Sequence, residues 1–541
     1  MKRIFLTLIM ISAAWSSLAC TNFIVTKGAS TDGSVMVSYA ADSHQLYGCL
    51  YKYTPVRNGS DEVAVYEWDT GKYLGKIPQA DVTYSTIGNM NEHSLIIAET
   101  TFGGREELET PNGIMDYGSL IYITLQRAKT AREAIETIAS LANEYGYASS
   151  GESFSIADRD EAWIMELVSK GPFGKGIVWV ARRIPDGYVS GHANQSRITS
   201  FPLDDPENTL YSDDVISFAR ERGYFNGRDD EFSFCDAYAP ADFGTIRGCD
   251  ARVWSFFRTV AAGMDEYTDY VLGHNPSHRL PLWVMPREKV SPKTVFDAMR
   301  DHYEGTPLDM TVDIGAGGHR CPYRWRPMNF EVDGTTYLNE RATATQQTGF
   351  WFVAQARPQL PADMGILWFG VDDAATSCLT PIYCSSTAVP ECLKEDNGSI
   401  LDYSDTSAFW IFNRVAHLAY LYYDRVAPVI RRNVDEWENG KLSEVAEIDA
   451  EAVKMPSKRR TKLLTRYSAE TAQKLFSKWQ SLDKYLFVKF IDGNIKTEDE
   501  NGFVENGAGK RIPDRIEQPG YSERWKRAVA ADNGEILKVL E

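Results

Sequence analysis

Apolar and polar residues alternate in short segments after position 20, a pattern typical of β-strands joined by turns. Residues 21–26 form one such segment, with Phe23 and Val25 on one face, and residues 35–39 form the next. The residues between them, Gly-Ala-Ser-Thr-Asp-Gly at 28–33, are turn formers. The pattern predicts a β-hairpin, and Cys20 stands immediately before its first strand.

The spacing of apolar positions changes further along the chain. From 118 to 145 they recur at helical intervals, which predicts one long helix. Asn194 follows a predicted strand, and residues 205–300 are expected to form helices and loops. Further strands are predicted at 154–156, 162–167, 177–180, 335–356 and 364–371, and apolar helices at 407–423 and 464–491, the last after the basic stretch KMPSKRRTK.

The chain is long enough for a large core, since 43% of its 541 residues are hydrophobic. It shows no internal repeat and no long low-complexity tract. We therefore expect one elaborated domain over residues 20–400, with residues 401–541 as a mostly helical C-terminal extension of that domain.

The first nineteen residues have the pattern of a secretory signal peptide. Lys2 and Arg3 precede an apolar run over 4–14, and small residues stand at Ser16, Ser17 and Ala19. The run is too short to span a bilayer. We expect residues 1–19 to be removed and the protein to be exported, either periplasmic or secreted, with no membrane span.

Charge and cysteine content narrow the classes of partner. Removing Lys2 and Arg3 changes the formal net charge from −18 to −20, which argues against nucleic acid and anionic membranes. Export would permit disulfides, with the cluster Cys378/Cys384/Cys392 and the pair Cys235/Cys249 as candidates. The sequence has neither a CxxC pair nor an HExxH motif, so we expect no metal and no other cofactor.

Cleavage after Ala19 would place Cys20 at the N-terminus, where two chemistries use cysteine. One is acylation of a lipoprotein, whose signal usually has a branched apolar residue where Ser17 stands. The other is nucleophilic catalysis, in which the thiol attacks a carbonyl and the α-amine, with a pKa of about 8, accepts the proton. Acylation would block both groups. The strand directly after Cys20 favours the nucleophile, because lipoproteins usually continue as a flexible tether.

Several segments together resemble a known family. They include CTNFIVTKGASTDGSV, GNMNEHSLIIAETTFGGREE, GESFSIADRDEAWIMEL and GHANQSRI, followed by GHRCPYRW and FWIFNRVAHLA. In this order they resemble the dipeptidase A-type cysteine dipeptidases. These are N-terminal-nucleophile hydrolases related to choloylglycine hydrolases and penicillin V acylases. The resemblance covers nearly all of the chain after residue 19 and implies an α+β fold, a four-layer αββα sandwich.

The resemblance also implies site residues. Cys20 matches the nucleophile, and Asp42 matches the aspartate that positions the α-amine. The backbone N–H of Thr101 and the side chain of Asn194 match the donors of the oxyanion hole. Arg252 matches a late arginine of the related acylases.

Three other observations leave alternatives open. Tyr39 stands where the related acylases have an arginine, and Arg258 lies close to Arg252. The motif glutamates could meet a substrate amine or form buried ion pairs; they are Glu92, Glu161 and Glu166.

Together, these inferences predict an exported cysteine dipeptidase that cleaves short peptides through a thioester intermediate. The alternatives are an acylase acting on N-acyl amides or conjugated bile salts, and a non-catalytic surface lipoprotein acylated at Cys20. The sequence leaves side-chain preference and homo-oligomer formation open.

Overall fold

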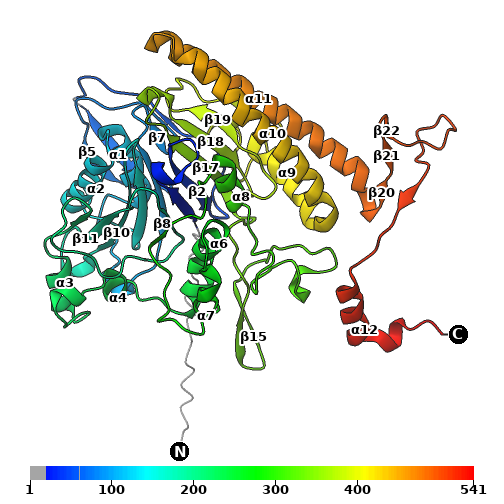
Figure 1. The fold of residues 1–541 in the computed structure, drawn as a ribbon, viewed down its shortest axis with the longest axis horizontal. Helices are drawn as coiled ribbons and strands as arrows, with labels where there is room; N and C mark the ends of the chain where they lie inside the picture. The colour runs from blue at the N-terminus through cyan, green and yellow to red at the C-terminus, as the bar shows by residue number, and fades with distance from the viewer. Residues whose placement is uncertain (1–19, 60, 541) are drawn as a thin grey trace, which may run out of the picture.

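Two antiparallel sheets packed face to face form the body of the protein. The computed structural model describes residues 20–59 and 61–540 (Figure 1). The larger sheet has the order β13 (Thr209–Tyr211), β11 (Ile177–Arg183), β10 (Ala162–Ser169), β9 (Glu152–Ala157), β8 (Ile96–Thr101), β7 (Met90–Asn91), β6 (Thr86–Ile87), β3 (Lys52–Tyr53). The other has the order β14 (Trp283–Val284), β12 (Val189–His192), β1 (Asn22–Val25), β2 (Val35–Asp42), β17 (Thr348–Ala356), β18 (Ile366–Val371), β19 (Thr380–Tyr383).

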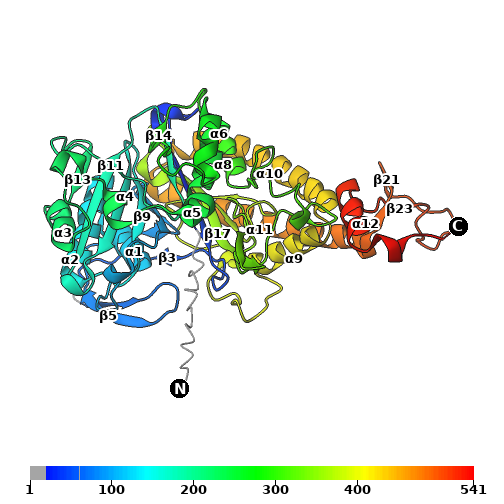
Figure 2. The same ribbon diagram turned by 90° about the horizontal axis from the view of Figure 1, so that it is seen from below.

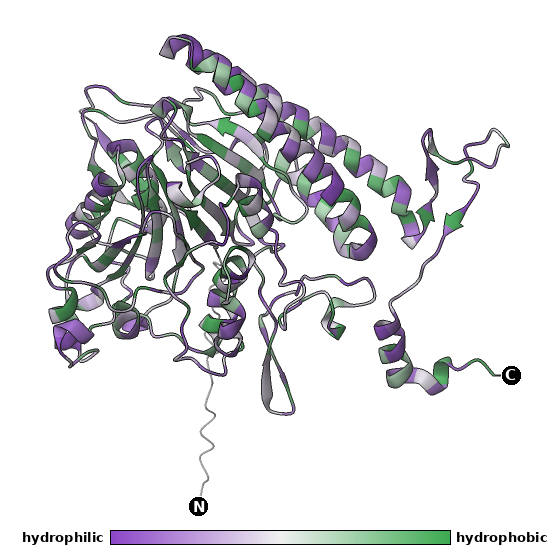
Figure 3. Cartoon of the chain, in the orientation of Figure 1, coloured by the Kyte–Doolittle hydropathy of each residue, from purple (hydrophilic) through white to green (hydrophobic). Residues whose placement is uncertain are grey.

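Helices cover the outer face of each sheet. Helices α1 (Tyr117–Arg127) and α2 (Ala131–Tyr145) pack on the eight-stranded sheet, and α6 (Ala251–Val260) and α8 (Pro292–Ala298) pack on the seven-stranded one. A third apolar cluster fills the space between the sheets. The sequence of layers is helix, sheet, sheet, helix, which confirms the predicted α+β sandwich. Hydrophobic residues concentrate in its strands (Figure 3).

The predicted hairpin is present: β1 and β2 pair antiparallel, with Ile24 opposite Val37. The single helix predicted over 118–145 is wrong, because the chain breaks between α1 and α2. Ala128 is extended, and the Thr130 side chain caps α2 by accepting from the Glu133 N–H. The apolar spacing continues across the break because α1 and α2 both bury their apolar faces in the same cluster on the eight-stranded sheet.

The strand predicted over 335–356 is also divided. Its first part, β16 (Thr335–Leu338), pairs with β15 (Asn329–Val332) in an exposed hairpin outside the sandwich. Residues 339–347 are irregular, and β17 then enters the central sheet beside β2. In this irregular stretch, the Arg341 guanidinium donates a hydrogen bond to the carboxylate of Asp42.

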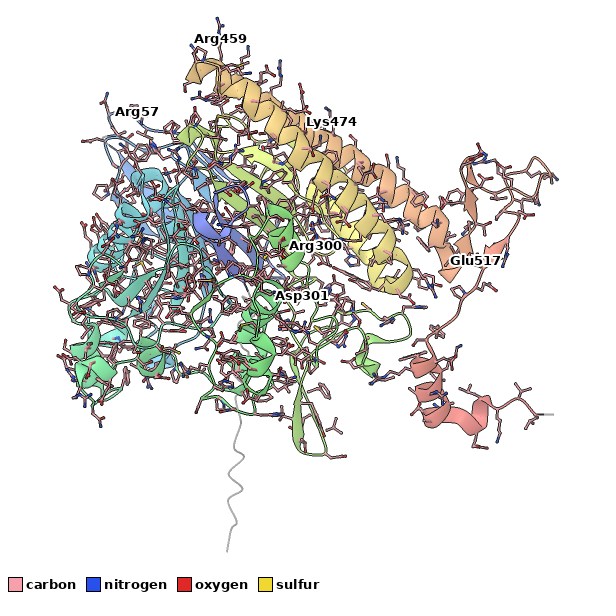
Figure 4. All side chains as sticks on the ribbon, in the orientation of Figure 1. Arg57, Arg300, Asp301, Arg459, Lys474 and Glu517 are labelled. Carbon is pink, nitrogen blue, oxygen red and sulfur yellow. The ribbon has the colours of Figure 1, made fainter. Side chains whose placement is uncertain are left out.

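Three long helices follow the sandwich. They are α9 (Ala408–Leu421), α10 (Tyr423–Ala452) and α11 (Ser457–Phe490). Helix α10 was not predicted, and the basic stretch begins α11 rather than preceding it. These helices pack against β18 and β19, with Phe412 stacked on Trp479 at 4.9 Å between ring centroids. Arg300, labelled in Figure 4 after α8, forms a buried ion pair with Glu438 of α10.

The C-terminal residues form an arm that extends away from the sandwich (Figure 2). It contains the strands β20 (Ile495–Lys496), β21 (Glu498–Asp499), β22 (Gly502–Phe503) and β23 (Ile516–Glu517), then α12 (Glu523–Leu537). The remaining short elements are β4 (Glu62–Tyr66), β5 (Tyr73–Pro78), α3 (Val215–Arg222), α4 (Phe234–Tyr238), α5 (Phe243–Thr245) and α7 (Thr268–Val271).

Two further expectations concern the chain as a whole. The candidate disulfides are not formed: all eight cysteines lie in the described part, and each is a free thiol. Cys378 contacts Glu438, whereas Cys384 contacts the Ala362 carbonyl, so these two thiols point to different neighbours. Among the described helices, none combines the length and apolar character needed to cross a membrane. The expected signal peptide lies outside the described residues.

Candidate active site

Cys20 lies two residues before β1, enclosed by both sheets. Its neighbour Thr21 exchanges two backbone hydrogen bonds with Ala40 of β2. The side chain is 4% exposed, and Sγ lies 3.3 Å from Glu99 Oε1 and 3.7 Å from the Tyr39 hydroxyl. Burial raises the pKa of the thiol well above its ordinary value, and the carboxylates of Glu99 and Asp42 raise that pKa further. The thiol is therefore protonated at neutral pH until a base accepts its proton.

Arg252 joins the predicted nucleophile to the predicted oxyanion hole. Its guanidinium is buried and donates to the Cys20 carbonyl at 2.6 Å and to the Thr21 hydroxyl at 2.8 Å. The same group donates to Asn194 Oδ1 at 2.9 Å and to the Ala193 carbonyl at 3.1 Å. Arg258 instead meets Asp265 at the surface. Of the two arginines, Arg252 is the one at the site.

Asn194 and Thr101 are in direct contact. The Asn194 side-chain N–H donates to the Thr101 carbonyl at 2.7 Å. Thr101 lies opposite Glu152 of β9, next to the pair in which the Phe102 N–H donates to the Gly151 carbonyl. Hydrogen-bonded pairs alternate along an antiparallel ladder, so the backbone N–H and C=O of Thr101 point away from β9. Asn194 has φ 62°, a left-handed conformation that asparagine tolerates well.

Asp42 ends β2 and is fully enclosed. Its carboxylate forms an ion pair with Arg341 and accepts from the Thr348 hydroxyl at 2.6 Å. The Gln347 side chain donates to its backbone carbonyl at 3.1 Å. A hydrogen bond joins its backbone to the Cys20 thiol. Asp42 thus lies beside Cys20, with its carboxylate held in place by residues from the start of β17 and the stretch before it.

Two buried glutamates were not predicted: Glu99, which contacts Cys20, and Glu152, which contacts Glu99. Glu99 of β8 accepts from the Tyr39 hydroxyl and faces the carboxyl group of Glu152 on β9. Burial raises the pKa of both carboxyl groups, and their proximity raises that of Glu152 further. The available signal was a single charged residue inside the apolar run LIIAETTF, two positions before Thr101.

The motif glutamates singled out from sequence have other partners. Glu92 accepts from the Ser85 N–H, and Glu161 forms ion pairs with Arg132 and Arg183. Glu166 of β10 accepts from the backbone N–H groups of Arg197 and Ile198 at 2.6 and 3.2 Å. Glu166 therefore anchors the turn that follows Asn194.

Glu166 is expected to make the protein less stable as the pH rises. Burial raises the pKa of its carboxyl group from 4.5 to about 7 in the folded protein. Between these values the folded state binds more protons than the unfolded state. The group's stabilising contribution is therefore full below pH 4.5 and is lost as the pH rises through 7, at no more than about 1.4 kcal/mol per pH unit. Urea unfolding across this window should show a shallower decline for Glu166→Gln. Equal slopes for variant and wild type would contradict the assignment.

A buried histidine ties the two sheets together next to the site. His192 ends β12, and its ring nitrogens pair with the hydroxyls of Thr100 and Ser155, each at 2.7 Å. Burial lowers the pKa of His192 to about 3, so the ring is neutral. With both nitrogens occupied, His192 positions β12 and hence Asn194, and it is not available as a base.

Comparison with known proteins identifies relatives over most of the chain. The model of peptidase family C69 matches residues 49–436. A probable dipeptidase of Latilactobacillus sakei is 23% identical over 510 residues, covering 88% of this chain and 98% of the relative. A probable dipeptidase of Salmonella dublin is 24% identical over 369 residues, covering 64% and 76%. A dipeptidase of Bifidobacterium longum is 24% identical over 421 residues, covering 70% and 73%. The family match includes Thr101, Asn194 and Arg252 and begins after Cys20 and Asp42.

Proposed function

Because this chain belongs to peptidase family C69, we propose that it is an exported dipeptidase that uses Cys20 as its nucleophile. One observation carries the proposal: the Arg252 guanidinium binds the Cys20 carbonyl and the Asn194 side chain together. A candidate nucleophile and a candidate oxyanion donor are thereby fixed relative to each other. The relatives named as dipeptidases supply the substrate class.

The proposed reaction begins with removal of residues 1–19, which frees the Cys20 α-amine. An amine with a pKa of about 8 can accept the thiol proton, and the thiolate then attacks the scissile carbonyl carbon. Asp42 lies beside Cys20 and would hold the protonated amine in place. No other residue is required as base, which agrees with the neutral, fully bonded His192.

The negative charge that forms on the carbonyl oxygen needs hydrogen-bond donors. The Asn194 side chain and the Thr101 N–H would supply them, with the Asn194 amide moving from the Thr101 carbonyl to the oxyanion. The C–N bond then breaks, and the amine-bound proton passes to the leaving nitrogen. Water attacks the resulting thioester, which releases the first amino acid and restores the thiol.

Mass spectrometry of the exported protein, combined with a substrate panel, tests this proposal. We expect an intact mass that begins at an unmodified Cys20. We also expect hydrolysis of dipeptides, with no comparable hydrolysis of N-acyl amino acids or bile-salt conjugates. An acylated Cys20, or a chain that starts elsewhere, would overturn the mechanism. Hydrolysis of the conjugates alone would overturn the substrate class.

A further inference from the structure

The Glu99–Glu152 pair is a buried acidic site in contact with the proposed nucleophile. Both side chains are fully buried, and Glu99 Oε1 lies 3.3 Å from Cys20 Sγ. Apart from the contact between the two carboxyl groups, Glu99 Oε2 and Glu152 Oε1 accept no hydrogen bond from any described residue. Neither glutamate forms an ion pair within residues 20–59 and 61–540. Burying a carboxylate without a cation costs free energy. The pair is therefore expected to bind a positively charged group.

The position of the pair indicates what that partner is. In a dipeptide the ammonium nitrogen is two bonds from the scissile carbonyl carbon. A productive complex places that carbon about 3–3.5 Å from the attacking sulfur. Because Glu99 Oε1 lies at a similar distance from the same sulfur, it is within reach of the ammonium group of the first residue.

We propose that the Glu99 carboxylate, supported by Glu152, binds the α-ammonium group of the substrate and so limits cleavage to the bond after the first residue. This inference rests on the proposed function of Cys20. Glu152 is itself held by the Thr101 hydroxyl, which donates to its Oε2 at 3.1 Å. The ammonium site and the proposed oxyanion donor therefore share one residue, and the amine and the carbonyl oxygen of the substrate are positioned together.

Tyr39 supports the Glu99 carboxyl group without adding a positive charge. The tyrosine hydroxyl donates to Glu99 Oε1, whereas an arginine at this position would form an ion pair and cancel the carboxylate charge. Asp69 lies nearby and is also acidic; burial raises the pKa of its carboxyl group to about 6, and it accepts from the Tyr117 hydroxyl at 2.8 Å. The surroundings of Glu99 thus favour a cation.

The test compares two substrates that differ only in the ammonium group, alanyl-alanine and propionyl-alanine. The wild-type enzyme should have a kcat/KM for alanyl-alanine at least about 100-fold above that for propionyl-alanine. In Glu99→Gln we expect kcat/KM for alanyl-alanine to fall about 100-fold further than kcat/KM for propionyl-alanine, since any effect of removing the carboxylate next to the Cys20 thiol acts on both substrates. If propionyl-alanine is not hydrolysed, its inhibition constant against alanyl-alanine replaces the second value and should stay unchanged.

The controls distinguish failure of the ammonium site from failure of the proposed function of Cys20. Glu92→Gln changes a glutamate in the same sequence segment, away from Cys20, and should leave both substrates unaffected. Glu99→Asp keeps the charge and should retain part of the discrimination, even if Glu99→Gln does not fold. An equal loss for both substrates in folded Glu99→Gln, or no loss for either, would overturn the ammonium site. Absence of Cys20-dependent hydrolysis in the wild type would instead overturn the proposed function.

Discussion

Replacing Cys20 with alanine is expected to lower kcat for dipeptides by at least about 10⁴-fold, because the thioester can no longer form. The remaining groups near Cys20 offer no substitute. Tyr39 is buried and donates to Glu99, and burial raises the pKa of its hydroxyl well above the ordinary value. Glu99 and Asp42 are held by their own partners. The loss should therefore appear in kcat, with little change in substrate binding.

Steady-state kinetics of Cys20→Ala beside Cys392→Ala would check this expectation. Cys392 is also a buried free thiol, so its replacement controls for the general effect of removing sulfur from the core. Iodoacetamide should inactivate the wild type by alkylating Cys20. Substantial activity in folded Cys20→Ala would show that another group attacks the substrate.

Arg252→Lys is expected to lower kcat by about 10²–10³-fold, the range measured when one oxyanion donor is lost. Lysine keeps the positive charge but lacks the planar guanidinium that reaches four acceptors around Cys20 and Asn194. Without that fork, Asn194 loses the contact that orients its amide. The effect should fall on kcat, because Arg252 acts through the position of other groups and does not reach the substrate.

Arg258→Lys is the matched control, since it lies on the same helix and pairs with Asp265 at the surface. It should leave both kcat and KM unchanged. A rise in KM at constant kcat for Arg252→Lys would place Arg252 in substrate binding. A fall in thermal stability with unchanged kinetics would leave it only a structural role.

The sandwich was predicted from the sequence. Several residues predicted from the sequence also meet at the proposed site. The β1–β2 hairpin follows from local alternation, and the family resemblance agrees with the match to peptidase family C69. Arg252 and Asn194 lie 58 positions apart and still meet through a hydrogen bond. The catalytic roles of all five predicted site residues remain predictions that the proposed variants and mass measurements test; these residues are Cys20, Asp42, Thr101, Asn194 and Arg252.

Other features depend on contacts that periodicity does not reveal. Arg341 lies 299 positions from Asp42, in a stretch expected to be a strand. Helix α10 escaped prediction because it buries only a narrow apolar stripe and contains Pro428 near its start. Glu99 and Glu152 face each other because β8 and β9 pair. Neither glutamate alone indicates a shared site.

The two ends of the chain have different consequences for recombinant work. If Cys20 must be the first residue, any affinity tag or vector-derived residue left before it would yield a folded but inactive preparation. The C-terminal arm, by contrast, projects away from the sandwich (Figure 2) and ends in exposed residues. A tag placed after Glu541 is therefore the arrangement to choose for expression, and an N-terminal fusion would serve as a deliberately inactive zymogen.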